Sequence, residues 1–203
     1  MKKLMIAATL AVATLSAVEI KAETNWSPVG VGIAAPVQWP WVTSSVYGLR
    51  FGGLCGYNND VYGLDLGVLD FAEGTTGSLA AGFANIVYGE GYGLQAAALN
   101  YDGAFYGMQV GALNWANYES RGLVIGAANV NLQDFAGFAI GAVNYAGSAS
   151  AVQIGAFNCA YEAKGLQIGF LNACDRLYGV QIGAFNIIAN SKLPIMVIAN
   201  ASF

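Results

Sequence analysis

Residues 165–186 read GLQIGFLNACDRLYGVQIGAFN and contain the same eight-residue unit twice, 14 residues apart. The unit is written Gly-Leu-Gln-Ile-Gly-Ala-Phe-Asn, and its clear copies occupy 107–114, 122–129, 137–144, 151–158, 165–172 and 179–186. Weaker copies end at Cys55, Asp70, Asn85, Asn100 and Asn200, so 11 units follow one another at spacings of 14 or 15 residues. A short period sustained over most of a chain indicates one structural unit used many times.

Apolar residues alternate with small or polar residues inside each unit. In the copy at 165–172, Leu166, Ile168 and Phe170 alternate with two glycines and Gln167. A period of two over eight residues predicts a β-strand, whereas a helix requires apolar residues at spacings of three and four. The segments between units, such as 146–150 and 189–192, are rich in Gly, Ser and Asn and are predicted turns.

The favoured fold class is all-β, a repeat-built antiparallel up-and-down β-barrel of about 12 strands. Each unit would supply one strand, and residues 29–38 would supply another, which makes the even number typical of bacterial barrels. Tyr and Trp bracket the units in the manner of the aromatic girdles at membrane interfaces. Leu, Ile and Ala would then face lipid, while Gly and Gln would line the interior.

The alternative fold is a parallel β-solenoid with 14–15 residues per coil, in which identical residues of successive units stack. The recurring Asn favours this fold, because a buried Asn ladder can bond its neighbours above and below. In such a solenoid we expect Gln to face solvent and Leu and Ile to be buried. The thinly polar exterior that results argues against it, since large apolar surfaces in water are costly.

The composition and the N-terminus predict an exported protein. Of 203 residues 10% are charged and 56% are apolar, whereas typical soluble domains have about 25% charged residues. Lys2 and Lys3 precede an apolar run at 4–18 that is short for a bilayer, so residues 1–22 are a predicted signal peptide. Residues 23–203 then form a single β-repeat domain, with repeats from about 46 to 203. Its five basic and eleven acidic residues leave a net charge of −6, which argues against nucleic acid as a partner.

The candidate site residues are the recurring Gly and Asn, to which we assign structural roles. Glycine inside a strand allows a close approach of backbone. For Asn we expect hydrogen bonds to local backbone at the strand end, and the alternative is a ring of amides that holds a ligand. These structural repeat positions are Gly111, Gly126, Gly141, Gly155, Gly169 and Gly183, together with Asn114, Asn129, Asn144, Asn158, Asn172, Asn186 and Asn200.

Catalytic chemistry is poorly represented in this chain. It has no His, which removes His-based triads, His metal ligands and the commonest general base. Most carboxylates, Asp102 included, lie singly in connectors and are interpreted as solvated turn residues. Asp60, Asp65 and Asp70 are the exception, because they could meet on adjacent strands in a weak cation site. We predict that the protein is not an enzyme, with no cofactor and no catalytic, cofactor-binding or metal residue assigned.

Three cysteines, Cys55, Cys159 and Cys174, remain in the predicted exported chain. Cys159 and Cys174 are the plausible disulfide pair if one bridge forms. The preferred interpretation is that all three are small buried residues.

The repeats resemble those of the leptospiral-type surface repeat proteins, a bacterial surface-repeat family with Gly-Leu-Gln-Ile-Gly-Leu-x-Asn units. The likeness includes APVQWP at 35–40, VYGLR at 46–50, VYGLD at 61–65 and the ending at 193–203. It departs at Cys55 and Asp70, which take the Asn place, and at Ala97, which takes the place of the second Gly. The resemblance implies the outer membrane or cell surface of a Gram-negative-type bacterium, and it carries no catalytic residues.

These observations lead us to expect a non-enzymatic envelope or outer-membrane surface repeat protein, structural or a passive pore, with outer-membrane lipid as its partner. The alternative function is a secreted β-solenoid interaction module for a glycan or a protein. In that case the exposed aromatics Trp115, Tyr145 and Tyr161 would bind the glycan.

Overall fold

Nine strands follow one another in residues 26–203, the part of the chain that the computed structural model describes. The predicted signal peptide at 1–22 lies outside these residues. The strands are β1 (Trp26–Ala34), β2 (Val37–Trp39), β3 (Ser45–Asn58), β4 (Val61–Ala72), β5 (Thr76–Ala81), β6 (Ala84–Ala96), β7 (Leu99–Ala116), β8 (Ser120–Ile188) and β9 (Ile195–Ser202).

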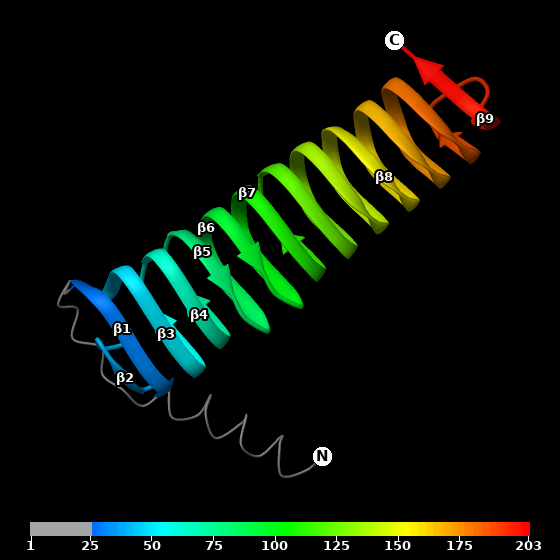
Figure 1. Cartoon of the computed structure of the whole chain (residues 1–203). Helices are drawn as coiled ribbons and strands as arrows, with labels where there is room; N and C mark the ends of the chain where they lie inside the picture. The colour runs from blue at the N-terminus through cyan, green and yellow to red at the C-terminus, as the bar shows by residue number, and fades with distance from the viewer. Residues whose placement is uncertain (1–25) are drawn as a thin grey trace.

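The coils of the chain lie on one another in parallel and in register (Figure 1). Val46 of β3 lies opposite Val61 of β4, and Asn85 of β6 lies opposite Asn100 of β7, each one repeat further along the chain. A parallel offset of one repeat is the pairing that places identical side chains opposite each other. The predicted antiparallel barrel is therefore wrong, and the alternative, a parallel β-solenoid, is correct.

Each coil contains more strand than the eight-residue unit predicts. The strand β8 is 69 residues long and includes 146–150, which is therefore strand and not the predicted turn. The turn predicted at 189–192 does follow β8. The first glycine of the unit has a conformational role, since Gly122 has a φ of +135°, which residues with side chains rarely adopt.

The inward-facing side chains are mostly polar or small. Gln95, Gln109, Gln153, Gln167 and Gln181 are at most 2% exposed, so they face neither a lumen nor solvent as the two predicted folds required. The outward positions beside them hold the Leu and Ile of the repeat, which a solenoid was expected to bury. The interior is filled by these side chains, so the passive pore expected of a barrel loses its structural basis.

Asparagine forms the continuous element of the interior. In seven successive bonds of 2.8–2.9 Å, the Nδ2 of each Asn from Asn85 to Asn172 donates to the Oδ1 of the next, and the last acceptor is Asn186. From Asn100 to Asn172 the second Nδ2 proton goes to a backbone carbonyl of the next coil at 2.9–3.1 Å. This ladder replaces the local backbone bonds that we expected.

The second glycine of the unit lies directly against the ladder. A Cβ on Gly126 would lie 2.7 Å from both Asn114 Nδ2 and the carbonyl oxygen of Gly111 in the preceding coil. Real Cβ atoms do not approach other atoms so closely, so a larger residue would push the coils apart. The equivalent glycines, each with a ladder amide and a carbonyl oxygen as neighbours, are Gly111, Gly141, Gly155, Gly169 and Gly183.

The two ends of the solenoid depart from the repeat. Strand β9 runs antiparallel to the end of β8, which places Asn200 opposite Gln181 and outside the Asn ladder. At the N-terminal end the expected strand at 29–38 is split into β1 and β2, which pair antiparallel. A register shift in β3 sets Gly56 opposite Asp70, so Cys55 does not occupy the Asn place as the sequence suggested.

Replacing Asn144 by Ala should destabilise the solenoid by about 3 kcal/mol, because it leaves Asn129 Nδ2, Asn158 Oδ1 and the Ile154 carbonyl without their partner. Urea unfolding followed by circular dichroism measures the effect. The control is Asn190→Ala in the exposed turn after β8. Equal losses in the two variants would show that the ladder does not stabilise the fold.

Candidate functional site: the outward-facing surface

Rows of apolar side chains cover the outside of the solenoid. In one row Ile140, Ile154 and Ile182 are 39%, 39% and 44% exposed, and in another Phe157 and Phe185 are 48% and 46% exposed. Strand residues point alternately to opposite faces, so amides on the inside force these residues to the outside. Within the repeat units the inner face is thus polar and the outer face apolar, the reverse of an ordinary soluble domain. The interior beneath the connector segments is apolar, with a buried cluster that includes Phe135, Leu177 and Ile188.

Charged side chains gather along the connectors between repeats. Glu119 pairs with Arg121 at 2.5 Å, and Glu162 pairs with Lys164 at 2.6 Å and with Arg176 at 2.9 Å. The hydrogen bond from Lys164 lowers the pKa of Glu162 below its usual range. Exposed pairs of this kind add little stability. Their effect is to give the solenoid one charged edge beside its apolar faces.

The three aromatic residues expected to bind a glycan do not form one open platform. Tyr145 and Tyr161 are 40% and 56% exposed, but the guanidinium of Arg176 lies 5.2 Å from the centroid of the Tyr161 ring. Trp115 is half-buried, and its Nε1 donates to Asn117 Oδ1 at 2.9 Å. The faces of Tyr161 and the polar group of Trp115 are therefore partly engaged within the chain.

A second aromatic row was not singled out as a site from the sequence. Tyr47 stacks on Tyr62 with ring centroids 5.2 Å apart, and Tyr92 stacks on Tyr106 at 5.0 Å. A hydrogen bond from the Tyr92 hydroxyl to Glu90, 2.6 Å long, raises the pKa of this tyrosine to about 12. The signal for this row was the Tyr that precedes the first Gly in several units.

The N-terminal coils hold a buried charged cluster. Arg50 donates from Nε and Nη2 to the two carboxylate oxygens of Asp65 at 2.7 and 2.6 Å, and Nη2 lies 3.6 Å from Asp70 Oδ1. Asp60 lies apart and accepts hydrogen bonds from Ser45 Oγ and the backbone N–H of Thr75. A guanidinium thus takes the place of the expected cation, and residues 26–203 contain no group of three metal-ligating side chains.

Asp102 is fully buried, in contrast to the solvated connector residue that the sequence suggested. Its carboxylate accepts hydrogen bonds from Gln95 Nε2 at 2.8 Å and Gln109 Nε2 at 2.6 Å. Burial raises its pKa to about 8 although both bonds act to lower it. Because this pKa is raised on folding, the stability that Asp102 contributes is largest in acid and falls as the pH rises through about 8.

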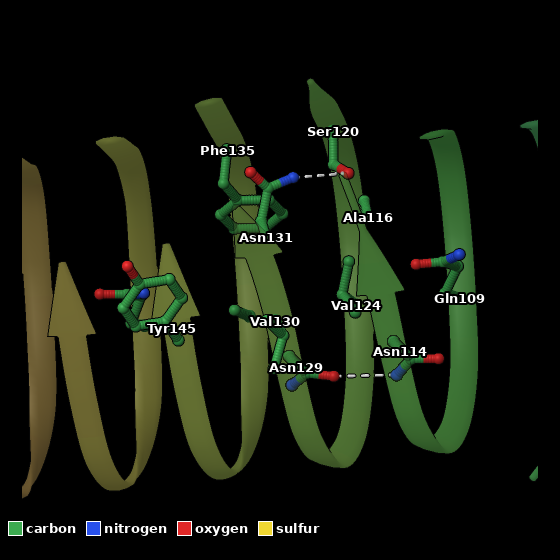
Figure 2. A pocket seen from close by; sticks show the side chains of 12 residues that line it. Gln109, Asn114, Ala116, Ser120, Val124, Asn129, Val130, Asn131, Phe135 and Tyr145 are labelled. Carbon is green, nitrogen blue, oxygen red and sulfur yellow. Dashed lines mark hydrogen bonds between the residues drawn. The ribbon is translucent and has the colours of Figure 1, made fainter. Parts of the chain in front are cut away.

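The Gln column is interrupted at Val124 and Ala139, where a cavity of about 20 Å³ opens in the interior (Figure 2). The same view shows Asn131 Nδ2 donating to Ser120 Oγ, a bond of 2.9 Å between two residues that line the cavity. A space of this size holds about one water molecule. The cavity is therefore too small for a ligand, which leaves the outer surface as the candidate functional site.

The three cysteines are free. Cys174 is buried, Cys55 is half-buried and Cys159 is exposed. Burial raises the pKa of Cys174 to about 11. The candidate disulfide is not formed, and the description as a small buried residue fits Cys174 alone.

Replacing Arg50 by Ala should destabilise the N-terminal coils by about 3–5 kcal/mol, because it leaves two buried carboxylates without a cation. Arg121→Ala is the matched control, since the Arg121 side chain is 65% exposed and its loss should cost less than about 1 kcal/mol. Chemical unfolding of both variants at pH 8 measures the difference. Similar values for the two would contradict a structural role for the buried cluster.

Comparison with protein family models, with curated proteins and with solved structures finds no match to this chain. The described part of the chain contains no helix that is long and apolar enough to cross a membrane. Function must therefore be inferred from the arrangement of side chains: an inner face of hydrogen-bonded amides, apolar outer rows and one charged edge.

Proposed function

We propose that this protein is a non-enzymatic, exported interaction module of the bacterial envelope and that it binds outer-membrane lipid through its outward apolar rows. The observation that carries the proposal is the inverted placement of polar and apolar side chains in the repeat units. Amides occupy the inside, so continuous rows of Ile, Leu and Phe stand outside, where water contact is unfavourable.

The distribution of charge favours a lipid surface over a polar partner. Ionised side chains on the outside lie along the connector edge, whereas the Ile row at 140, 154, 168 and 182 contains none. Separation of an apolar face from a charged edge is the arrangement that elements lying in a membrane interface use. The solenoid would lie on the bilayer with an apolar face in the headgroup region and the charged edge in water.

The negative net charge of the protein argues against electrostatic recruitment to anionic lipid. Residues 23–203 carry a net charge of −6, so anionic lipids repel the protein and do not recruit it. Burial of apolar area is then the driving force, and it depends little on salt. Vesicles of zwitterionic lipid are the appropriate probe.

Glycan binding is the second candidate, and the exposed rings of Tyr145 and Tyr161 favour it. Sugars stack on open aromatic faces, but Arg176 lies over the ring of Tyr161, and the Nε1 of the third aromatic, Trp115, is bonded to Asn117. Lipid is preferred because the apolar rows extend much further along the solenoid than these two rings. Glycan binding would be favoured if the protein were retained on immobilised envelope glycans, if Tyr145→Ala lost this retention, and if the triple variant Ile140→Asp/Ile154→Asp/Ile168→Asp kept it.

We expect the chain from residue 23 to float with vesicles of phosphatidylcholine and to remain bound at raised salt. The variant Ile140→Asp/Ile154→Asp/Ile168→Asp should lose binding by about tenfold or more, because burying three such side chains contributes several kcal/mol. Ser150→Asp/Asn190→Asp/Ser191→Asp adds the same charge at exposed connector positions and should still bind.

Circular dichroism of both variants checks that the solenoid is intact, as expected when substitutions fall on the outer surface. Absence of the wild-type protein from floated vesicles would overturn the lipid proposal. Equal loss in the two triple variants would show that charge, and not the Ile row, controls binding.

A further inference from the structure

The first rung of the Asn ladder differs from all the others. The ladder begins at Asn85 of β6, and the preceding position of the same column is Asp70 of β4, which lies opposite Asn85 in the parallel pairing. Asp70 and Asn85 are each 2% exposed. A carboxyl group thus faces a carboxamide in a place closed to water.

The geometry around Asp70 and Asn85 can be compared with that of a regular Asn–Asn pair in the ladder. At Gly111 a Cβ would lie 2.9 Å from Asn100 Nδ2 and 3.0 Å from Asn114 Oδ1, the donor and acceptor of one ladder bond. At the equivalent Gly82 it would lie 3.0 Å from Asp70 Oδ2 and 3.3 Å from Asn85 Oδ1. Asp70 Oδ2 therefore occupies the position that the donor nitrogen has in the rest of the ladder.

This rung has hydrogen-bond acceptors on both sides and lacks a donor unless Asp70 carries a proton. Neither oxygen of Asp70 has a hydrogen-bond partner, and Asn85 Oδ1 has none either. Two buried acceptors that face each other leave both groups unsatisfied, at a cost of about 1–3 kcal/mol each. A hydrogen on Asp70 Oδ2 converts one of them into the missing donor.

The ionisable groups around Asp70 favour its neutral form. Arg50 of β3 is the cation that faces it, and the guanidinium of Arg50 is already engaged by both carboxylate oxygens of Asp65, at shorter distances than its 3.6 Å to Asp70 Oδ1. The other titratable group of β3 near Asp70 is the thiol of Cys55, whose pKa is raised by burial. Strand β5 (Thr76–Ala81) has no charged residue, and Asn85 of β6 is uncharged. Burial and, to a smaller extent, the neighbouring Asp65 raise the pKa of Asp70, Arg50 acts to lower it, and the net effect is a pKa of about 7.

We propose that Asp70 keeps a proton in the folded solenoid and donates it from Oδ2 to Asn85 Oδ1, which makes the N-terminal rung of the ladder a pH-dependent lock. Loss of the proton sets a carboxylate against Asn85 Oδ1 and breaks the rung between β4 and β6. The coils from Asn85 onward keep their amide bonds, so the loosening is confined to the N-terminal end.

The direction of the pH effect follows from the raised pKa. The folded form binds the proton more tightly than the unfolded chain, whose aspartate has its ordinary pKa of 3.8. The stabilisation is therefore complete below about pH 4 and is lost as the pH rises through about 7.

The test compares the wild-type chain with Asp70→Asn, which supplies a permanent N–H donor at this rung. Unfolding constants and amide hydrogen exchange in β3–β6 are measured from pH 4 to 9, with Asp134→Asn at an exposed connector as control. Between pH 4 and 7 the ratio of the wild-type unfolding constant to that of Asp70→Asn should rise by up to tenfold per pH unit. Asp134→Asn should follow the wild type. Parallel profiles for the wild type and Asp70→Asn would overturn the proposal.

A second measurement decides the matter if Asp70→Asn does not fold. Carboxyl ¹³C resonances of labelled aspartate are followed in the Asp102→Asn variant, which removes the other aspartate with a raised pKa. One aspartate should remain protonated well above pH 5. If every aspartate in that variant titrates near its ordinary pKa, Asp70 is ionised in the fold and the lock does not exist.

Discussion

The hydrogen bonds between successive Asn side chains, from Asn85 to Asn186, are the constraint on which the rest of the solenoid depends. Each bond requires the next coil to lie parallel, in register and about 4.8 Å away. The spacing in turn requires glycine at positions such as Gly126, where a side chain would collide with the ladder. Amides in low dielectric must be fully paired, so one satisfied rung favours the same geometry in the next coil.

The polar interior also determines the outer surface. With Gln167 and Asn172 directed inward, their neighbours Leu166, Ile168 and Phe170 have to point outward, because strand residues alternate. An ordinary domain gains stability by burying such residues, whereas this chain leaves them available to a partner. The stability of the fold and its capacity for apolar binding therefore have the same origin, and the charged connectors restrict that binding to the faces of the solenoid.

The departures from the repeat are concentrated where the ladders stop. In the N-terminal coils Arg50 and Asp65 replace two inward amides with an ion pair of similar reach, and Asp70 replaces the first Asn. In the middle, Val124 and Ala139 interrupt the Gln column and leave a small cavity that the Asn ladder bypasses. The Gln column can thus lose several amides while the Asn ladder beside it remains continuous, because the parallel backbone pairing keeps the coils in register.

The sequence by itself determined that the repeat units are β-strands, the period of 14 or 15 residues and the alternation within each unit, because these are local patterns of a single strand. The recurring Asn also indicated a possible hydrogen-bonded ladder, but only for the parallel β-solenoid, which was the alternative fold. Only the tertiary structure decided that the coils are parallel, that Asn200 leaves the ladder and that Asp102 is buried. Strand alternation is the same for either direction of pairing and does not say which face is inside. That choice depends on contacts between coils, where the hydrogen bonds of the amide ladder hold Asn and Gln inside and leave Leu and Ile outside.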